Sequence, residues 1–156
     1  MHQSLVVPRI FAQAFLLPRR PRRHRMNTKR RGEISEAALF LKAVTQGFAV
    51  AKPWGDNERY DLILDSGERL WRVQLKSTRT LRAGGYDVQP IYSIYGHGKR
   101  GYTPDQIDVL IVHIVPRDLW YVLPVAAYSP SKSLRFYPDA TLSPTCLLYT
   151  SPSPRD

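Results

Sequence analysis

An aspartate, a glutamine and a lysine fall at related positions on two adjacent predicted strands. Asp61 begins the apolar segment YDLILD, and Gln74 and Lys76 end the segment LWRVQLK. Carboxylate and amide oxygens are ligands of the kind that Mg²⁺ prefers. An ammonium group beside them can stabilise negative charge on a phosphate. These residue types make a divalent-metal site one hypothesis for this pair of strands.

The alternation of side chains supports the pairing of these strands as a hairpin. Ser66-Gly67 is a turn signal between the strands Tyr60–Asp65 and Leu70–Lys76. A turn centred there, with an even-numbered loop, predicts Asp61 opposite Arg72 and diagonal to Gln74. A one-residue slip would mix the apolar and polar faces. The predicted faces are Tyr60, Leu62, Leu64, Trp71, Val73 and Leu75 on one side, and Asp61, Ile63, Asp65, Leu70, Arg72, Gln74 and Lys76 on the other.

This polar face also has a simpler interpretation. The outer face of a half-buried hairpin is usually solvated, and an Asp–Lys pair on a surface contributes little stability. His97 is a candidate general base, but an exposed loop histidine is the simpler interpretation. His113 lies within an apolar run and is interpreted as a buried core residue. Spacing alone therefore leaves the metal site as one of two hypotheses.

The elements around the hairpin predict one α/β unit. Ile34, Ala37, Ala38, Leu41 and Val44 recur at near-helical spacing, and Gly47 ends that helix. The continuous apolar run Val109–Val115 is typical of a buried central strand. The remaining predictions are a helix over Glu33–Gln46, strands over Phe48–Ala51, Tyr86–Tyr95 (with Pro90 as a break) and finally Trp120–Pro124, and a flexible basic loop over Gly96–Gly101.

The two ends of the chain differ from the segment between them. Residues 1–25 hold six arginines and no acid, which fits an over-called start with Met26 as initiator, a basic DNA-binding arm or an organelle transit peptide. Residues 146–156 read CLLYTSPSPRD, which matches a translated transposon-based sequencing adapter. We therefore expect a single domain over residues 26–145 that lacks its natural C-terminus.

Composition narrows the class of protein. The formal net charge of +10 indicates a polyanionic partner. Most of the excess lies in the leader, since residues 26–145 hold 16 basic and 12 acidic residues, a net of +4. No apolar stretch approaches the ~20 residues of a membrane helix. A single cysteine excludes a disulfide framework and suits the cytoplasm, where we place the protein.

A longer pattern surrounds the hairpin. A helix containing GEISE is followed by RYD and then by QLKST on the next strand. From about Met26 to Ala126, this order resembles the PD-(D/E)XK nuclease superfamily, and in particular its group I intron-encoded homing endonucleases. Glu36, Asp61, Gln74 and Lys76 match the four catalytic positions of that pattern. Gln74 departs from the usual Asp or Glu, although glutamine occurs there in this branch.

The resemblance implies a fold and a mechanism. The expected fold is a restriction-endonuclease-like core, a mixed central β-sheet flanked by helices. The expected cofactor is Mg²⁺, with Mn²⁺ as a substitute, held by Asp61, the Gln74 amide, the Leu75 carbonyl and Glu36. Lys76 would orient the attacking water and stabilise the pentacovalent phosphate. The products would be a 5′-phosphate and a 3′-hydroxyl.

The expected substrate is double-stranded DNA, cut by a homo-oligomer. One active site cuts one strand, so a double-strand break requires at least two subunits, as a dimer or a tetramer. A DNA-repair or junction-resolving nuclease and a non-catalytic nucleic-acid-binding module remain as alternatives. Basic residues beside the predicted site and in the glycine-flanked loop are candidate DNA contacts: Lys29, Arg30, Arg31, Arg79, Arg82, Lys99 and Arg100.

Overall fold

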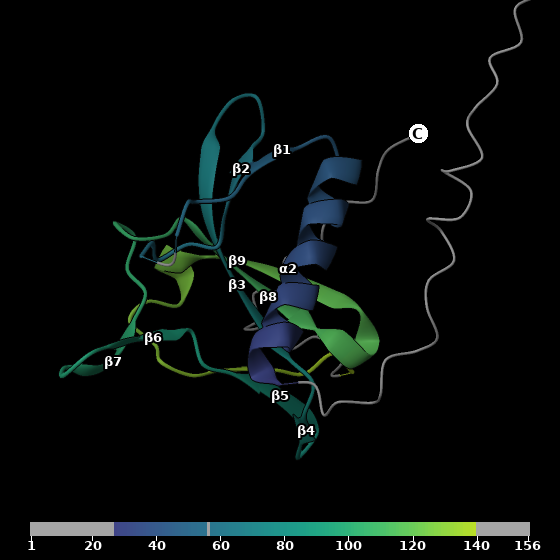
Figure 1. Ribbon diagram of the computed structural model, residues 1–156. Coiled ribbons are helices and arrows are strands. Elements are labelled where there is room, and N and C mark those ends of the chain that lie inside the picture. Colours follow the sequence, from purple (N-terminus) through teal and green to yellow (C-terminus); the bar gives the residue numbers. More distant parts are fainter. Residues whose placement is uncertain (1–26, 56, 140–156) are drawn as a thin grey trace, which may run out of the picture.

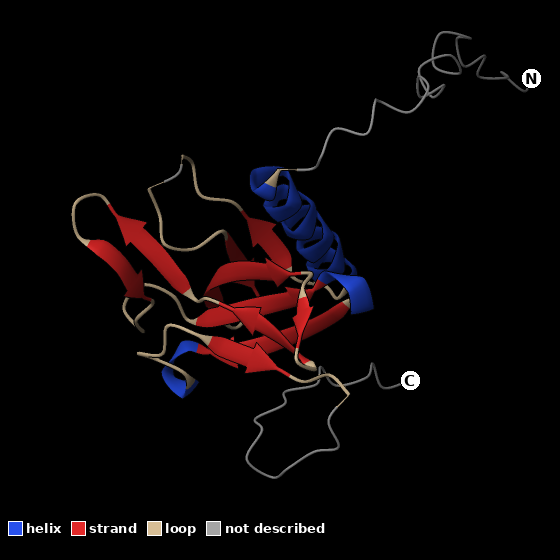
Figure 2. Ribbon diagram, turned by 90° about the horizontal axis from the view of Figure 1, so that it is seen from below, coloured by secondary structure: helices blue, strands red, loops and turns tan. Residues whose placement is uncertain are grey.

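The computed structural model describes residues 27–55 and 57–139, so the predicted leader and tail lie outside the described residues. Helix α2 (Thr28–Thr45) packs on one face of a five-stranded sheet (Figure 1, Figure 2). The sheet is built from β1 (Ala49–Ala51), β2 (Leu62–Asp65), β3 (Leu70–Thr78), β8 (Val109–Ile114) and β9 (Leu119–Pro124). Its strand order is β1-β2-β3-β8-β9, and β3 and β8 are the parallel pair in an otherwise antiparallel arrangement. The predicted mixed sheet is confirmed.

Helix α2 begins earlier than its apolar spacing predicts. Asn27 is the N-cap, and its Oδ1 accepts a hydrogen bond from the Arg30 amide at 2.8 Å. The predicted start at Glu33 is therefore wrong. The helix buries Leu39 and Ala43 against the sheet, whereas Leu41, which helped to predict the helix, is 66% exposed. Periodicity identified the helix but not the face that it packs.

The hairpin of β2 and β3 has a different register from the predicted one. Ile63, not Asp61, lies opposite Arg72, because the loop between Asp65 and Leu70 is centred one residue later than predicted. The Asp65 carboxylate accepts a hydrogen bond from the Gly67 amide at 2.8 Å, and Gly67 has a φ of +84°. The register differs by two residues, so the predicted faces are unchanged.

Two hydrophobic clusters lie on opposite faces of the sheet. The cluster under α2 contains four of the six predicted apolar residues of the hairpin as buried side chains, with Trp71 packed at its margin. Tyr60 is the exception, since it packs against the other cluster. The cluster under α2 consists of Leu39, Ala43, Leu62, Leu64, Val73, Leu75, Val109 and Ile111.

The second face is covered by strands in the described part of the chain, so the expectation of flanking helices holds for one face. A three-stranded sheet, β10-β5-β4, lies there, and a hairpin of β6 and β7 extends beside it (Figure 1). Gln89-Pro90 separates β5 from β6, as the proline predicts. The bounds are β4 (Leu81–Arg82), β5 (Gly85–Val88), β6 (Ile91–Ile94), β7 (Gly98–Gly101) and β10 (Leu134–Phe136).

Three other predictions can be compared with these strands. All six residues of β8 are buried, which confirms the central-strand prediction for Val109–Val115. The predicted loop over Gly96–Gly101 is wrong in part, because Gly98–Gly101 pairs with β6. Strand β9 confirms the prediction over Trp120–Pro124, although β10 follows it. None of the described helices is long and apolar enough to span a membrane.

Candidate active site

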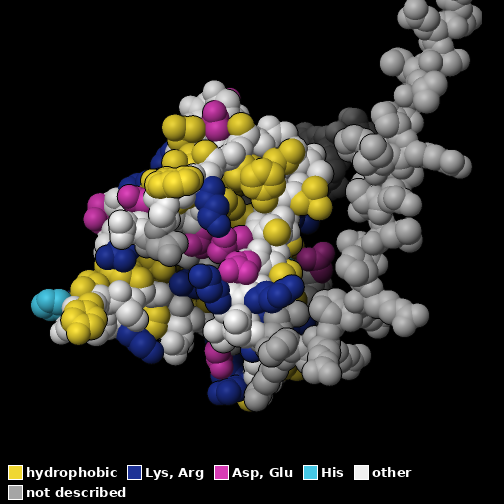
Figure 3. Space-filling model, viewed as in Figure 1, with side chains coloured by type: hydrophobic (Ala, Val, Ile, Leu, Met, Phe, Trp, Pro, Cys, Tyr) yellow, Lys and Arg dark blue, Asp and Glu magenta, His cyan; other side chains and the backbone are white. Residues whose placement is uncertain are grey.

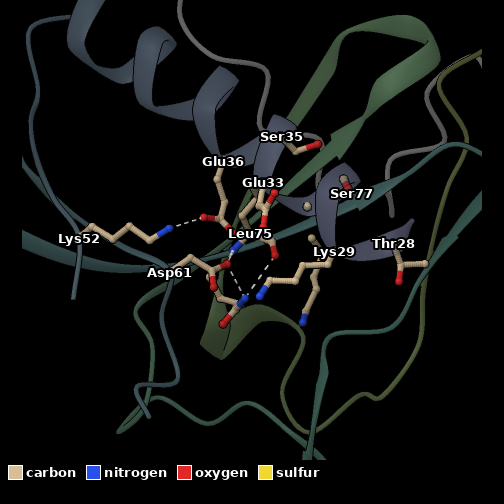
Figure 4. Close-up of a pocket in the computed structure, with 12 residues that line it drawn as sticks. Thr28, Lys29, Glu33, Ser35, Glu36, Lys52, Asp61, Leu75 and Ser77 are labelled. Carbon is tan, nitrogen blue, oxygen red and sulfur yellow. Dashed lines mark hydrogen bonds and ion pairs between the residues drawn. The ribbon is translucent and has the colours of Figure 1, made fainter. Parts of the chain in front are cut away.

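Strand β3 continues beyond the point where β2 begins, and this leaves a notch in the sheet. Residues 70–73 pair with β2, whereas residues 74–78 pair with β8 but not with β2. The N-terminal half of α2 borders the open edge, and a pocket of about 570 Å³ lies there (Figure 4). Its lining residues are Thr28, Lys29, Gly32, Glu33, Ser35, Glu36, Lys52, Asp61, Gln74, Leu75, Lys76 and Ser77.

Asp61 lies at the start of this notch and takes the place of a strand partner. Its amide donates to the Val73 carbonyl at 2.8 Å. Its Oδ2 accepts hydrogen bonds from the Leu75 amide at 2.8 Å and from Gln74 Nε2 at 2.5 Å (Figure 4). The unpaired edge of β3 therefore fixes the Asp61 carboxylate directly, because an edge amide needs an acceptor.

Burial dominates the electrostatics of Asp61. Desolvation raises the pKa of its carboxyl group, the Leu75 amide lowers it, and the negative charge of Glu36 raises it further. The net pKa lies above the ordinary aspartate value, despite the nearby Lys76. Acids with a raised pKa in a pocket are typical of functional sites, because packing alone does not favour a desolvated charge.

Glu36 projects from α2 toward the same pocket as Asp61 (Figure 4). Its Oε2 forms an ion pair with Lys52 Nζ at 2.7 Å. Sequence reasoning missed Lys52, which follows β1 and lies outside any periodic pattern. It also missed Glu33, a third carboxylate that lines the pocket. The position of Glu33 one helical turn before Glu36 was the available signal.

Gln74 and Lys76 reach the site from β3. Gln74 is buried, and its Nε2 also donates to the Leu75 carbonyl at 3.2 Å. Burial lowers the pKa of the Lys76 ammonium, and the charge of Asp61 partly offsets this effect. The structure thus brings all five of the predicted catalytic and metal-binding residues to one pocket, namely Glu36, Asp61, Gln74, Leu75 and Lys76.

The donor atoms at the notch fit a hard divalent cation. They are the oxygens of the Asp61 and Glu36 carboxylates and of the Leu75 carbonyl. Gln74 Nε2 faces both Asp61 and the Leu75 carbonyl, so the Gln74 side-chain amide has to turn over before its oxygen joins this set. Within residues 27–55 and 57–139, no group of three or more His, Cys, Asp or Glu side chains could hold a metal ion. The proposed ligands therefore include two neutral groups, a backbone carbonyl and a side-chain amide, beside two carboxylates.

Comparison with known proteins agrees with this geometry. A family model described as PD-(D/E)XK endonuclease matches residues 26–141. The chain belongs to the PD-(D/E)XK endonuclease family. The predicted family and its fold are therefore confirmed.

Solved structures add to this assignment. The chain is similar to a bacterial homing endonuclease, I-Ssp6803I, with a TM-score of 0.63 and 28% sequence identity over 70% of this chain and 78% of that one. MepB is similar with a TM-score of 0.44 and 14% identity over 74% of this chain and 86% of that one, which is too distant to support an argument. No curated protein sequence is significantly similar to this chain.

In this PD-(D/E)XK chain, the predicted DNA contacts fall into separate groups. Lys29, Arg30 and Arg31 lie in the first turns of α2 rather than before it, and Lys29 lines the pocket. Arg79 follows the pocket end of β3, and acidic side chains at the centre of the face in Figure 3 have lysines and arginines around them. The other predicted contacts are exposed on β4 and β7 and are Arg82, Lys99 and Arg100.

The two histidines in the described residues have no place in the pocket. His97 is exposed in the turn between β6 and β7. His113 is buried on β8, where its Nδ1 lies 3.3 Å from Ser35 Oγ and its ring stacks on Trp120 at 3.8 Å. Burial lowers the pKa of His113 despite the carboxylate of Asp118. The prediction of a core histidine is confirmed.

Proposed function

We propose that this PD-(D/E)XK endonuclease is a Mg²⁺-dependent endodeoxyribonuclease that hydrolyses phosphodiester bonds in double-stranded DNA. One observation carries the proposal. The Asp61 carboxylate is half-buried, fixed by the open edge of β3, and shares its pocket with the Lys76 ammonium. The pocket thus combines a carboxylate that can bind a metal cation with an ammonium group that can bind a phosphate.

Each residue has a distinct part. Asp61 and the Leu75 carbonyl would hold the ion, with Glu36 and the Gln74 amide completing its oxygen ligands. When bound, Mg²⁺ would supply charge neutralisation of the phosphate and a lower pKa for water. Lys76 would orient the attacking water and donate hydrogen bonds to the phosphate oxygens as negative charge grows on them. Lys52 would hold the Glu36 carboxylate through their 2.7 Å ion pair.

Cleavage of supercoiled plasmid tests this assignment. We expect Asp61→Asn and Lys76→Ala each to slow Mg²⁺-dependent nicking by at least about 100-fold, because each removes charge from the reacting centre. Glu68→Gln, in the exposed turn of the same hairpin, and Lys132→Ala, on an exposed loop, are matched controls that should cut normally. Equal nicking by wild type and both site variants would favour a non-catalytic nucleic-acid-binding module.

The finer biological role is also a proposal. The likeness to a bacterial homing endonuclease supports sequence-specific cleavage. We propose that this cleavage serves intron homing and that the chain acts in the cytoplasm, which its single cysteine suits. Cutting both strands then requires at least two active sites, hence a dimer or a tetramer. Light scattering of the purified chain with duplex DNA measures the subunit number. Strong competition by a four-way junction against linear duplex would instead support a junction-resolving nuclease.

The separate basic groups would bind the DNA backbone on both sides of the pocket. Lys99 and Arg100 provide the simplest test, because they lie on the exposed β7 strand. Replacing both by alanine should weaken DNA binding uniformly across sequences and reduce the slope of log K against log salt by about 2. An unchanged slope would remove this hairpin from the proposed interface.

A further inference from the structure

The Lys76 ammonium group lies against an aromatic ring that the proposed mechanism does not use. Lys76 projects to the face of the sheet opposite α2, and its Nζ lies 5.4 Å from the centroid of the Tyr102 ring. This distance is within the range of a cation–π interaction. Across the part of the chain that the structure describes, the Nζ makes no ion pair within 4 Å and no hydrogen bond.

A partner that orders the lysine side chain before the phosphate binds lowers the entropic cost of acting on that phosphate. The four-carbon side chain has many rotamers, and fixing them costs up to ~2 kcal/mol of conformational entropy. Asp61 attracts the ammonium but holds it no closer than the 4 Å limit of an ion pair. Among the described residues, the Tyr102 ring is therefore the one direct partner of the Lys76 ammonium group.

Tyr102 is itself held firmly. It is 3% exposed, directly after β7, and its ring packs on Tyr92 at 5.3 Å. Tyr92 is fixed in turn, because its hydroxyl accepts a hydrogen bond from Gln106 Nε2 at 2.9 Å and the Arg59 guanidinium lies 4.2 Å from its ring. The Tyr102 carbonyl accepts a hydrogen bond from Ser129 Oγ at 3.2 Å. The ring facing the ammonium thus belongs to a rigid, packed unit.

We propose that Tyr102 is a positioning residue for cleavage, whose ring face holds the Lys76 ammonium in the Asp61 pocket. The inference rests on the proposed function. Tyr102 does not touch the reacting atoms; it acts through Lys76. The ring, not the hydroxyl, performs this role, because the hydroxyl lies 3.5 Å from the Ile91 carbonyl, at the limit of a hydrogen bond.

Single-turnover nicking of supercoiled plasmid with Mg²⁺ tests the role of the ring. Tyr102→Met fills a similar space without an aromatic face and should slow the saturated rate about tenfold, with the enzyme concentration at half-saturation unchanged. Tyr102→Phe keeps the ring and should restore the wild-type rate. Tyr128→Met removes another buried tyrosine of the same cluster and is the matched control. Equal rates for Tyr102→Met and Tyr102→Phe, or equal slowing by Tyr128→Met, would overturn the proposal.

A double substitution separates positioning from general weakening of the core. In a Lys76→Ala background, Tyr102→Met should cause no further loss of rate, because the ammonium it holds is gone. A full additional tenfold loss would show that Tyr102 acts by another route and would overturn the proposal.

A measurement without activity separates this inference from the proposed function. The ring face should shift the Lys76 side-chain NMR signals upfield in the wild-type chain and in Tyr102→Phe, and the shift should be absent in Tyr102→Met. No upfield shift in the folded wild type would overturn the proposal, even if Tyr102→Met does not fold. If the shift is present but wild type does not nick DNA, the proposed function fails and the Lys76–Tyr102 contact stands.

Discussion

Two clusters of charged side chains lie along β3, and the pKa of the aspartate is lowered in one cluster and raised in the other. At the start of the strand, the Asp108 carboxylate accepts hydrogen bonds from the Arg72 amide at 2.8 Å and from Arg72 Nε at 3.2 Å. Arg72 Nη2 adds a third contact at 3.2 Å, and Arg69 Nη2 a fourth at 3.3 Å. The Arg72 guanidinium also donates to the Asp105 and Pro104 carbonyls. Every charge in this cluster has a direct partner.

The cluster at the other end of β3 is incompletely paired. Asp61 accepts hydrogen bonds from neutral amides, and Lys76 lies over an aromatic ring. The pKa values record the contrast. Hydrogen bonding to Arg72 lowers the pKa of Asp108, whereas burial raises the pKa of Asp61. The first cluster therefore stabilises the fold, whereas under the proposed function the second keeps its charges available for a ligand at some cost in stability.

Breaking the paired cluster should have the largest effect on stability. Asp108→Asn removes the charge that faces both arginines, so we expect a loss of about 2 kcal/mol in the free energy of unfolding at pH 7. Urea denaturation measures this loss. Asp87→Asn, in a more exposed pair with Arg135, is the matched control and should cost less. If Asp108→Asn is no less stable than wild type, the paired cluster is not structural.

The same variant has a defined pH dependence. The folded pKa of Asp108 is lowered, so its contribution is fully present above the unfolded value and is lost as pH falls through the folded value. The stability difference between wild type and Asp108→Asn should therefore shrink in acid. A difference that is constant from neutral pH into the acid range would contradict this origin.

Adding charge to the incomplete cluster should have an intermediate effect. Gln74→Glu places a second carboxylate where the Gln74 amide now donates to Asp61 at 2.5 Å. We expect metal-free protein to be less stable and the Mg²⁺ concentration for half-maximal cleavage to fall about tenfold, or ~1.4 kcal/mol. Gln89→Glu, an exposed position, is the control. Unchanged Mg²⁺ dependence would argue against a cation beside position 74.

Removing charge from the incomplete cluster should have the smallest effect, with the opposite sign from Asp108→Asn. The raised pKa of Asp61 means that its charged form opposes folding increasingly as pH rises through the folded value. Asp61→Asn keeps an acceptor for the Leu75 amide and should stabilise the protein by about 0.5 kcal/mol at pH 7 in EDTA. Thermal melts measure the gain, which should vanish in acid. A loss of stability at pH 7 would mean that the Asp61 charge is structurally required.

Part of the second cluster could be predicted from the sequence alone. Strand alternation placed Asp61, Gln74 and Lys76 on one face of the hairpin. This assignment is correct although the register was wrong, because a shift of two residues leaves every side chain on the same face. The register itself depends on the turn at Asp65 and Gly67, which alternation does not encode. Family motifs added Glu36, which no local pattern linked to the hairpin.

Contacts between distant segments were the part that could not be predicted. Lys52 meets Glu36 across 16 residues, and Arg72 meets Asp108 across 36. No sequence motif indicates that these residues are in contact. The strands that cover the second face of the sheet were not predicted for the same reason, because β10 pairs with β5, which lies far from it in the sequence. Only the folded backbone determines which of these residues meet.

The open edge of β3 places part of the proposed site in the main chain. The main chain of Leu75 presents its amide to Asp61 and its carbonyl to the pocket, whereas the Leu75 side chain packs under α2. Any residue except proline supplies the same amide. Related chains can therefore replace this leucine by another apolar residue and keep the ligand, but a single insertion or deletion in β3 would carry the peptide group out of the pocket. At this position the length of β3, rather than the identity of the side chain, determines whether the main-chain ligand stays in the pocket.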